Sequence, residues 1–310
     1  MRREADEYYN EMINAPSLLN KGQFEKYYID PTPVPEKMVW QLTGKSADSI
    51  IKASLVVAEL GGIGVDLNMG CSAPDIVNSG AGVAWMLKPR SETQWLVKGV
   101  KDVLNQYEKE SGNHRRLSVK LRLGDADFTD ESFFSFTDML VESGVECLAL
   151  HPRTRKERYR DLPRWKYAED LALRYKGQIE VYVNGDIMDK KSAEKVSGLC
   201  PHCNGLMIGR MAAQKPWIFE ELSSSSADDG KKQIDLLEAA LDFIDWVEKY
   251  QPQEFYKTRL QRFFAYYCQN FSFAHYAQTQ MLNAKDIDDS RKRIREYFEK
   301  VPGDRYKYSI

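Results

Sequence analysis

The sequence of 310 residues contains no apolar run long enough to span a bilayer and no signal-peptide pattern at its N-terminus. It contains only five cysteines, an odd number without a framework of even spacings, which argues for a reducing compartment. Its formal net charge is only −2, so any surface that attracts nucleic acid must be a local patch. We therefore expect a cytoplasmic protein without a membrane segment, and no feature demands an obligate protein partner.

What the sequence does contain is an alternation of short apolar runs and longer amphipathic stretches up to about residue 222. The expected strands lie near residues 7–11, 38–42, 64–68, 117–122, 146–150, 180–183 and 205–208. The clearest expected helices cover residues 46–60, 92–110, 130–143 and 190–196. This alternation indicates parallel strands joined by right-handed crossovers. We predict an α/β fold, a (β/α)8 barrel of the TIM type that lacks one of its eight strands.

The C-terminal part has a different character. Residues 223–230 are small and polar and predict a linker between a barrel domain, 1–222, and a second domain, 231–310. Apolar residues recur at helical spacing from Ile234 to Tyr250, and further helical patterns follow. No strand signal is evident, so the second domain is predicted to be small and all-helical.

A cysteine follows the third predicted strand in the segment Gly64-Val-Asp-Leu-Asn-Met-Gly-Cys-Ser-Ala-Pro74. Gly70 permits a sharp turn, which would present Cys71 at the carboxyl end of the strand. Parallel α/β folds carry their chemistry at that end. By itself, Cys71 is as readily explained as a small buried side chain.

This segment resembles the D-x-N-x-G-C-P signature of the tRNA-dihydrouridine synthases, whose cysteine is the catalytic acid. Further segments match the same family in the same order: 39–44, 118–124, 148–155, 181–187 and 206–211. The resemblance extends from about Asp6 into the C-terminal helices. It implies a barrel that binds FMN, followed by a helical tRNA-binding domain.

Two positions depart from the family pattern. Ser72 stands where the family usually has proline, which affects only the rigidity of the turn. The family's first strand, with its Ala-Pro-Met segment, has no counterpart here. We expect that Met1 is not the natural start or that the first strand has been lost, and that the N-terminal segment or another chain covers the open edges.

The resemblance implies reduction of a uridine C5–C6 double bond in tRNA. NADPH would reduce FMN, the reduced flavin would deliver hydride to C6, and the Cys71 thiol would protonate C5. Asn68 would position the uracil or hold the turn, and Arg153 would meet phosphate or the RNA backbone. The implied cofactor-binding residues are Gln41, Lys120, His151, Asn184, Gly185, Asp186, Gly209 and Arg210.

Other interpretations remain open. Lys120 is alternatively an outward-facing strand residue, and a lone histidine such as His151 is more often structural than catalytic. Cys200-Pro-His-Cys203 is half of a zinc motif without a second pair, so we predict no metal. Basic clusters near residues 256–267 and 291–295 indicate RNA contact or ordinary charged helix surfaces. The alternative functions are an FMN-dependent barrel oxidoreductase acting on a small molecule and a non-catalytic tRNA-binding relative.

Overall fold

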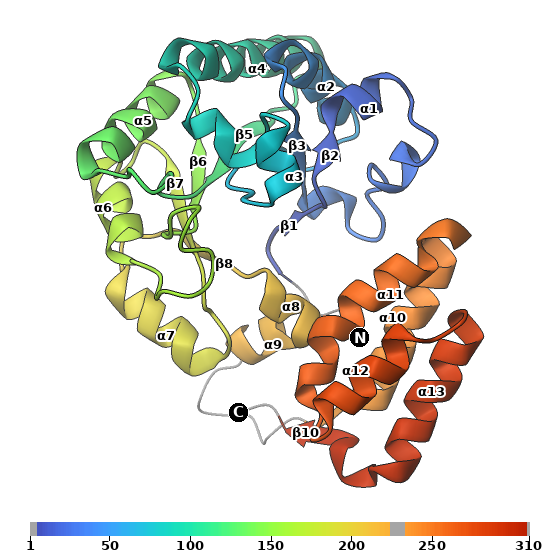
Figure 1. The fold of residues 1–310 in the computed structure, drawn as a ribbon. Coiled ribbons are helices and arrows are strands. Elements are labelled where there is room, and N and C mark those ends of the chain that lie inside the picture. The colour runs from blue at the N-terminus through green and yellow to red at the C-terminus, as the bar shows by residue number, and fades with distance from the viewer. Residues whose placement is uncertain (1–4, 224–232, 309–310) are drawn as a thin grey trace. The chain divides into compact units, whose positions relative to one another are not determined.

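The computed structural model describes residues 5–223 and 233–308 (Figure 1). The described chain forms two compact units, and the first contains residues 6–187 and 194–207. The second unit contains the other described residues, chiefly those from Ile208 onward. Residues 224–230 of the predicted linker lie outside the described residues. The predicted domain boundaries therefore stay a prediction.

The first unit is built on a curled, all-parallel sheet with helices around its outside (Figure 1). The strands follow the order β1-β3-β4-β5-β6-β7-β8, and β2 also pairs with β3. Their bounds are β1 Tyr8–Tyr9, β2 Ile13–Asn14, β3 Met38–Thr43, β4 Gly64–Met69, β5 Arg116–Leu121, β6 Cys147–Leu150, β7 Glu180–Asn184 and β8 Gly205–Met207. This half-barrel with seven strand positions confirms the predicted fold class.

The longer helices of this unit match the amphipathic stretches of the sequence. They are α2 Ala47–Glu59, α4 Arg90–Ser111, α5 Asp130–Glu142 and α6 Lys166–Arg174, together with α7 Lys190–Leu199, which belongs to this unit from residue 194 onward. Short helical segments lie between the strands: α1 Ala15–Leu19, η1 Glu25–Tyr27, η2 Pro35–Lys37, α3 Pro74–Asn78 and η3 Gly82–Met86. Among the described residues, no helix combines the length and apolarity needed to cross a membrane.

The central strands β3 and β4 are buried at every position. A parallel sheet covered by helices requires this, because both of its faces are removed from water. Along β4, apolar Val65 and Leu67 alternate with polar Asp66 and Asn68, so the polar pair shares one face of the sheet. That face carries the candidate site.

Of the predicted first strand, 7–11, only β1, Tyr8–Tyr9, forms, and the short strand β2, Ile13–Asn14, follows outside that range; both run parallel to β3. The interruption falls at Asn10, whose Oδ1 atom accepts the backbone N–H of Gln41 at 2.6 Å. Its Nδ2 atom donates to the Tyr28 carbonyl oxygen at 3.2 Å. The Asn10 side chain thus takes the place of one backbone hydrogen bond in the pairing with β3.

A half-buried polar cluster fixes the same N-terminal segment to the distant strands. Arg116 of β5 forms ion pairs with Glu7 at 2.6 Å and with Glu180 of β7 at 2.6 Å. The Tyr182 hydroxyl donates to Glu7 at 3.0 Å and accepts from Arg116 at 3.0 Å. Burial raises the pKa of Tyr9, whose hydroxyl accepts from Arg116 at 3.3 Å. Segments far apart in the sequence are therefore held by one guanidinium.

The second unit is mainly helical. Its helical segments are α8 Arg210–Gln214, α9 Ile218–Ser223, α10 Leu236–Tyr250, α11 Gln253–Tyr267, η4 Cys268–Asn270, α12 Ala274–Leu282, α13 Ile287–Lys300 and η5 Pro302–Asp304. The expectation that this region contains no strand was wrong, because β9, Gln233–Asp235, pairs antiparallel with β10, Tyr306–Tyr308. The two strands are short, and their pairing joins distant residues, so neither has a local sequence signal.

Candidate functional site at the carboxyl end of β4

A relay of buried polar side chains fixes the backbone of the cysteine turn. The Ser118 hydroxyl and the Gln41 amide donate to the two carboxylate oxygens of Asp66, at 2.6 Å and 2.8 Å. Asn68 Nδ2 donates to Gln41 Oε1 at 2.8 Å. The other end of the amide, Asn68 Oδ1, accepts the backbone N–H of Cys71 at 2.9 Å. Of the two roles expected for Asn68, its contacts match the one that holds the turn.

Asp66 is the electrostatic centre of this relay. It is fully buried, and burial raises its pKa from 3.8 to about 6. Hydrogen bonds from Ser118 and Gln41, together with the positive charge of Lys120, limit the rise. The sequence analysis did not select Asp66 or Ser118, although a carboxylate inside an otherwise apolar strand was a usable signal.

Lys120 lies beside Asn68 in the register of β4 and β5. It shares the face of Ser118, two residues earlier in the strand, and therefore faces the relay. Burial lowers the pKa of Lys120, and the nearby Arg122 charge lowers it further. Among the described residues its ammonium has no hydrogen-bond or ion-pair partner. The site therefore holds a half-buried cation that is able to meet an anionic or polar ligand.

The turn around Cys71 is held from further sides. Its carbonyl oxygen accepts the backbone N–H of Val83 at 3.0 Å. Gly82 has a φ of +61°, and a Cβ atom there would lie 2.6 Å from the Cys71 oxygen. The buried Arg122 donates through Nε to the Gly70 carbonyl oxygen at 3.0 Å. The half-buried thiol is therefore carried by a turn with little freedom to move.

Arg153 and His151 form a second cluster, after β6. Only 1% of Arg153 is exposed, and its guanidinium makes a two-point ion pair with Asp186 at 3.0 and 2.5 Å. It also lies 3.1 Å from His151 Nε2 and donates to the Asp161 carbonyl oxygen. Because a guanidinium has no acceptor, Nε2 must accept, which places the proton of the neutral ring on Nδ1. Arg153 thus orients His151.

The loop after β7 contributes Asn184, Gly185 and Asp186. Gly185 has a φ of +114°, and a Cβ atom there would lie 3.0 Å from His151 Cδ2, so glycine permits the close approach of this loop to the imidazole. Asn184 Nδ2 donates to the Met207 carbonyl oxygen at 2.6 Å, which ties the loop to β8.

The other two predicted cofactor residues lie in the second unit. Gly209 is the N-cap residue of α8, and Arg210 is the first residue of that helix. Their roles stay predictions.

A surface hollow of about 430 Å³ lies over the loops that follow β5 and β6. Its lining residues are Ala126, Phe128, Thr154, Lys156, Glu157, Arg160, Asp161 and Arg164. Three of them are cations, and Lys156 and Arg160 are exposed. The loop after β6, which carries all three cations, offers positive charge for an anionic ligand.

The predicted basic cluster at 291–295 in α13 is largely neutralised by neighbouring acids. Arg291 contacts Asp245 at 2.8 Å and Asp288 at 3.0 Å, and it also pairs with Glu248. Arg293 pairs with Asp289 at 2.8 Å. The net positive charge of this helix face is therefore smaller than its sequence suggested.

Comparison with known proteins identifies the family that shares this arrangement. The model of the family described as dihydrouridine synthase (Dus) matches residues 1–302. The chain belongs to the dihydrouridine synthase family. This confirms the resemblance seen in the sequence and the expected class of enzyme, whereas the roles of individual residues stay predictions.

Curated members of the Dus family resemble the chain over most of its length. A probable tRNA-dihydrouridine synthase 2 from Bacillus subtilis is 28% identical over 269 residues, which cover 86% of this chain and 77% of the relative. A probable tRNA-dihydrouridine synthase from Aquifex aeolicus is 26% identical over 309 residues, which cover 96% and 90%. A crystal structure of DHODH in complex with ferulenol from Eimeria tenella matches 64% of this chain and 61% of its own chain at 15% identity, with a TM-score of 0.46.

Proposed function

We propose that this protein reduces the C5–C6 double bond of a uridine in tRNA, with FMN as cofactor and NADPH as reductant. Membership of the Dus family, together with relatives named tRNA-dihydrouridine synthases, supports tRNA as the partner. The observation that carries the proposal is the position of Cys71, fixed by Asn68 at the carboxyl end of β4 and one strand away from Lys120. A cytoplasmic location stays a prediction.

The residues at this end of the sheet fit a flavin. When bound and reduced, FMN would supply the hydride for C6 of the uracil. Lys120, a half-buried cation without a protein partner among the described residues, would favour negative charge on the flavin ring. The Gln41 amide donates one N–H to Asp66, and its second N–H, without a partner among the described residues, would serve the pyrimidine edge of the flavin. His151 would contact the flavin with the ring orientation that Arg153 imposes.

The remaining proposed cofactor contacts serve the phosphate. Gly185 brings backbone close to His151 without a side chain in between, and it lies between Asn184 and Asp186. Backbone N–H groups of such a turn are suitable phosphate donors. On the family resemblance alone, we also assign phosphate contacts to Gly209 and Arg210.

Cys71 is the proposed proton donor. Its thiol gives a proton to C5 as C6 accepts the hydride, and water returns the proton to sulfur afterwards. The Cys71 N–H donates to Asn68 Oδ1, which fixes the Cys71 backbone. This in turn limits the positions from which the sulfur can donate its proton. A positioned donor of this kind typically contributes about 10²–10⁴-fold in rate.

For Arg153 we propose a positioning role in place of the direct RNA contact expected from the sequence. Its guanidinium is buried and shared among Asp186, His151 and a backbone carbonyl, so little of it faces solvent. The exposed cations Lys156 and Arg160 of the same loop are better placed to meet phosphates of the tRNA backbone.

Mass spectrometry of tRNA tests the proposal. Transfer RNA free of dihydrouridine is incubated with the protein, FMN and NADPH, and the digested nucleosides and fragments are weighed. We expect a gain of two hydrogens at one uridine, and none when NADPH is omitted. Absence of the gain with flavin-loaded protein would refute the proposed reaction, and equal reduction of free uridine would refute tRNA as its substrate.

A further inference from the structure

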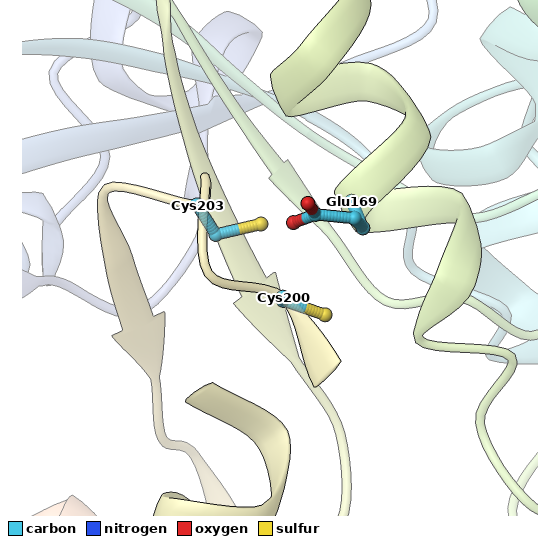
Figure 2. Close-up of side chains that lie close together, drawn as sticks. All are labelled: Glu169, Cys200 and Cys203. Atoms are coloured by element: carbon cyan, nitrogen blue, oxygen red, sulfur yellow. The ribbon is translucent and has the colours of Figure 1, made fainter. Parts of the chain in front are cut away.

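A cluster of metal-binding side chains lies in the first unit, in the turn between α7 and β8. The turn contributes Cys200 and Cys203, and α6 contributes Glu169 (Figure 2). Their two sulfur atoms and a carboxylate oxygen all lie within 4.8 Å of one another. Figure 2 shows the Cys203 sulfur and the Glu169 carboxylate pointing toward each other across the space between turn and helix.

From this arrangement we propose a zinc site in which Cys200, Cys203 and Glu169 are the protein ligands. The site is separate from the proposed reaction at Cys71. The sequence suggested only half of a zinc motif, because the third ligand comes from another helix. Thiolates favour Zn²⁺, and a carboxylate completes many zinc sites.

The geometry suits a tetrahedral ion. Zinc–sulfur bonds of about 2.3 Å and zinc–oxygen bonds of about 2.0–2.2 Å require ligand atoms roughly 3.5–3.8 Å apart. The three ligand atoms already lie within 4.8 Å of one another. Side-chain rotations that move these atoms by a few tenths of an ångström to about 1 Å would bring them to the tetrahedral spacing. The N–H of Cys203 donates to the Cys200 carbonyl oxygen at 3.2 Å, which keeps both cysteines on one tight turn.

His202 holds the carboxylate ligand in place. Its backbone N–H donates to Glu169 Oε2 at 3.1 Å, and its ring Nδ1 lies 2.5 Å from Glu169 Oε1. A metal-binding carboxylate is commonly oriented by such an outer partner. His202 is thus a positioning residue, and a solvent molecule would fill the fourth position.

Electrostatics favour a cation here over a redox-active dithiol. Reactive Cys-x-x-Cys pairs lie where positive charge stabilises a thiolate, often at a helix N-terminus. Here Cys200 follows the C-terminus of α7, which carries partial negative charge, and Glu169 adds a carboxylate. A divalent cation here would face two sulfur atoms, a carboxylate and the negative end of α7.

A bound ion would also strengthen a weak part of the fold. Strand β8 has only three residues and lies at the end of the strand order, paired with β7. Asn204, next to Cys203, makes hydrogen bonds with Val181 through its backbone N–H at 2.8 Å and its side-chain oxygen at 2.9 Å. Fixing Cys203 to α6 would hold this edge strand in register.

The test measures metal content and cobalt spectra on the full chain. After dialysis against metal-free buffer we expect one zinc per chain, and Co²⁺ added to stripped protein should give thiolate-to-cobalt charge-transfer absorption at one equivalent. Cys203→Ser should abolish the absorption. Glu169→Gln, which keeps the side-chain volume, should weaken Co²⁺ binding at least about tenfold, with folding verified by circular dichroism.

Cys268→Ala is the matched control, because Cys268 is a buried cysteine of the second unit and should leave zinc and cobalt binding unchanged. Protein that retains no zinc and gives no thiolate absorption with Co²⁺ would overturn the proposal. So would a reversible Cys200–Cys203 disulfide formed in the presence of stoichiometric zinc, which would assign the pair to redox chemistry instead.

Discussion

Replacing Asp66 by asparagine should change how the stability of the first unit depends on pH. The carboxylate is fully buried, and its pKa is raised from 3.8 to about 6. A pKa that is higher in the folded chain favours folding at low pH, and this contribution is lost as the pH rises through the folded value. The wild-type free energy of unfolding should therefore fall between about pH 4 and pH 7.

The size of this effect follows from the pKa itself. Each unit of pKa difference between the folded and unfolded chain corresponds to about 1.4 kcal/mol, so raising the Asp66 pKa to about 6 corresponds to about 3 kcal/mol. Asparagine has nearly the same shape and no charge. Its oxygen can accept from Gln41 while its NH₂ donates to Ser118, because a hydroxyl can accept as well as donate.

Urea unfolding at a series of pH values measures the difference. Asp66→Asn should be close to wild type near pH 4 and should gain about 3 kcal/mol over wild type by about pH 7. Asp102→Asn, which removes an exposed carboxylate on α4, is the control for the change of charge. A difference between Asp66→Asn and wild type that does not vary with pH, or a variant several kcal/mol less stable at neutral pH, would refute the assigned electrostatics.

Three further variants test neighbouring contacts. Ser118→Ala removes a hydrogen bond that lowers the Asp66 pKa, so the pH-dependent fall in unfolding free energy should move to higher pH. If the same urea series places this fall at the wild-type pH, the reasoning is contradicted. Arg153→Met removes the two-point contact with the partly exposed Asp186 carboxylate and should lose about 1.5–3 kcal/mol in urea unfolding. A loss below about 1 kcal/mol would show that the pair is not tightly held. Gly185→Ala forces a Cβ atom to 3.0 Å from His151 at a positive φ, so we expect the variant to retain less flavin. Flavin absorbance after gel filtration measures this, and full retention would contradict the close approach.

The sequence predicted the half-barrel because its signals are local. Strand-sized apolar runs alternate with amphipathic stretches, and the predicted strand at 64–68 agrees with β4, Gly64–Met69, to within one residue. Cys71 was found in the same way, since a strand, a glycine and a cysteine are adjacent in the chain. The family resemblance supplied the remaining candidates.

The relay behind Cys71 was not predictable from such signals. Its hydrogen bonds join Gln41, Asp66 and Ser118, and they depend on the register of three strands, which no short segment determines. The burial of Arg153 was missed for a related reason. An arginine in a polar loop indicates a solvated surface unless a distant residue, here Asp186, is known to pair with it.

The central claim is that Cys71 is the proton donor, and the most direct test is the turnover of Cys71→Ala. The variant should retain FMN, and tRNA should reoxidise its reduced flavin about 10²–10⁴-fold more slowly than in wild type. Cys268→Ala, altered at a buried cysteine of the second unit, should reoxidise at the wild-type rate. Reoxidation of Cys71→Ala at the wild-type rate would contradict the account and remove Cys71 from the reaction.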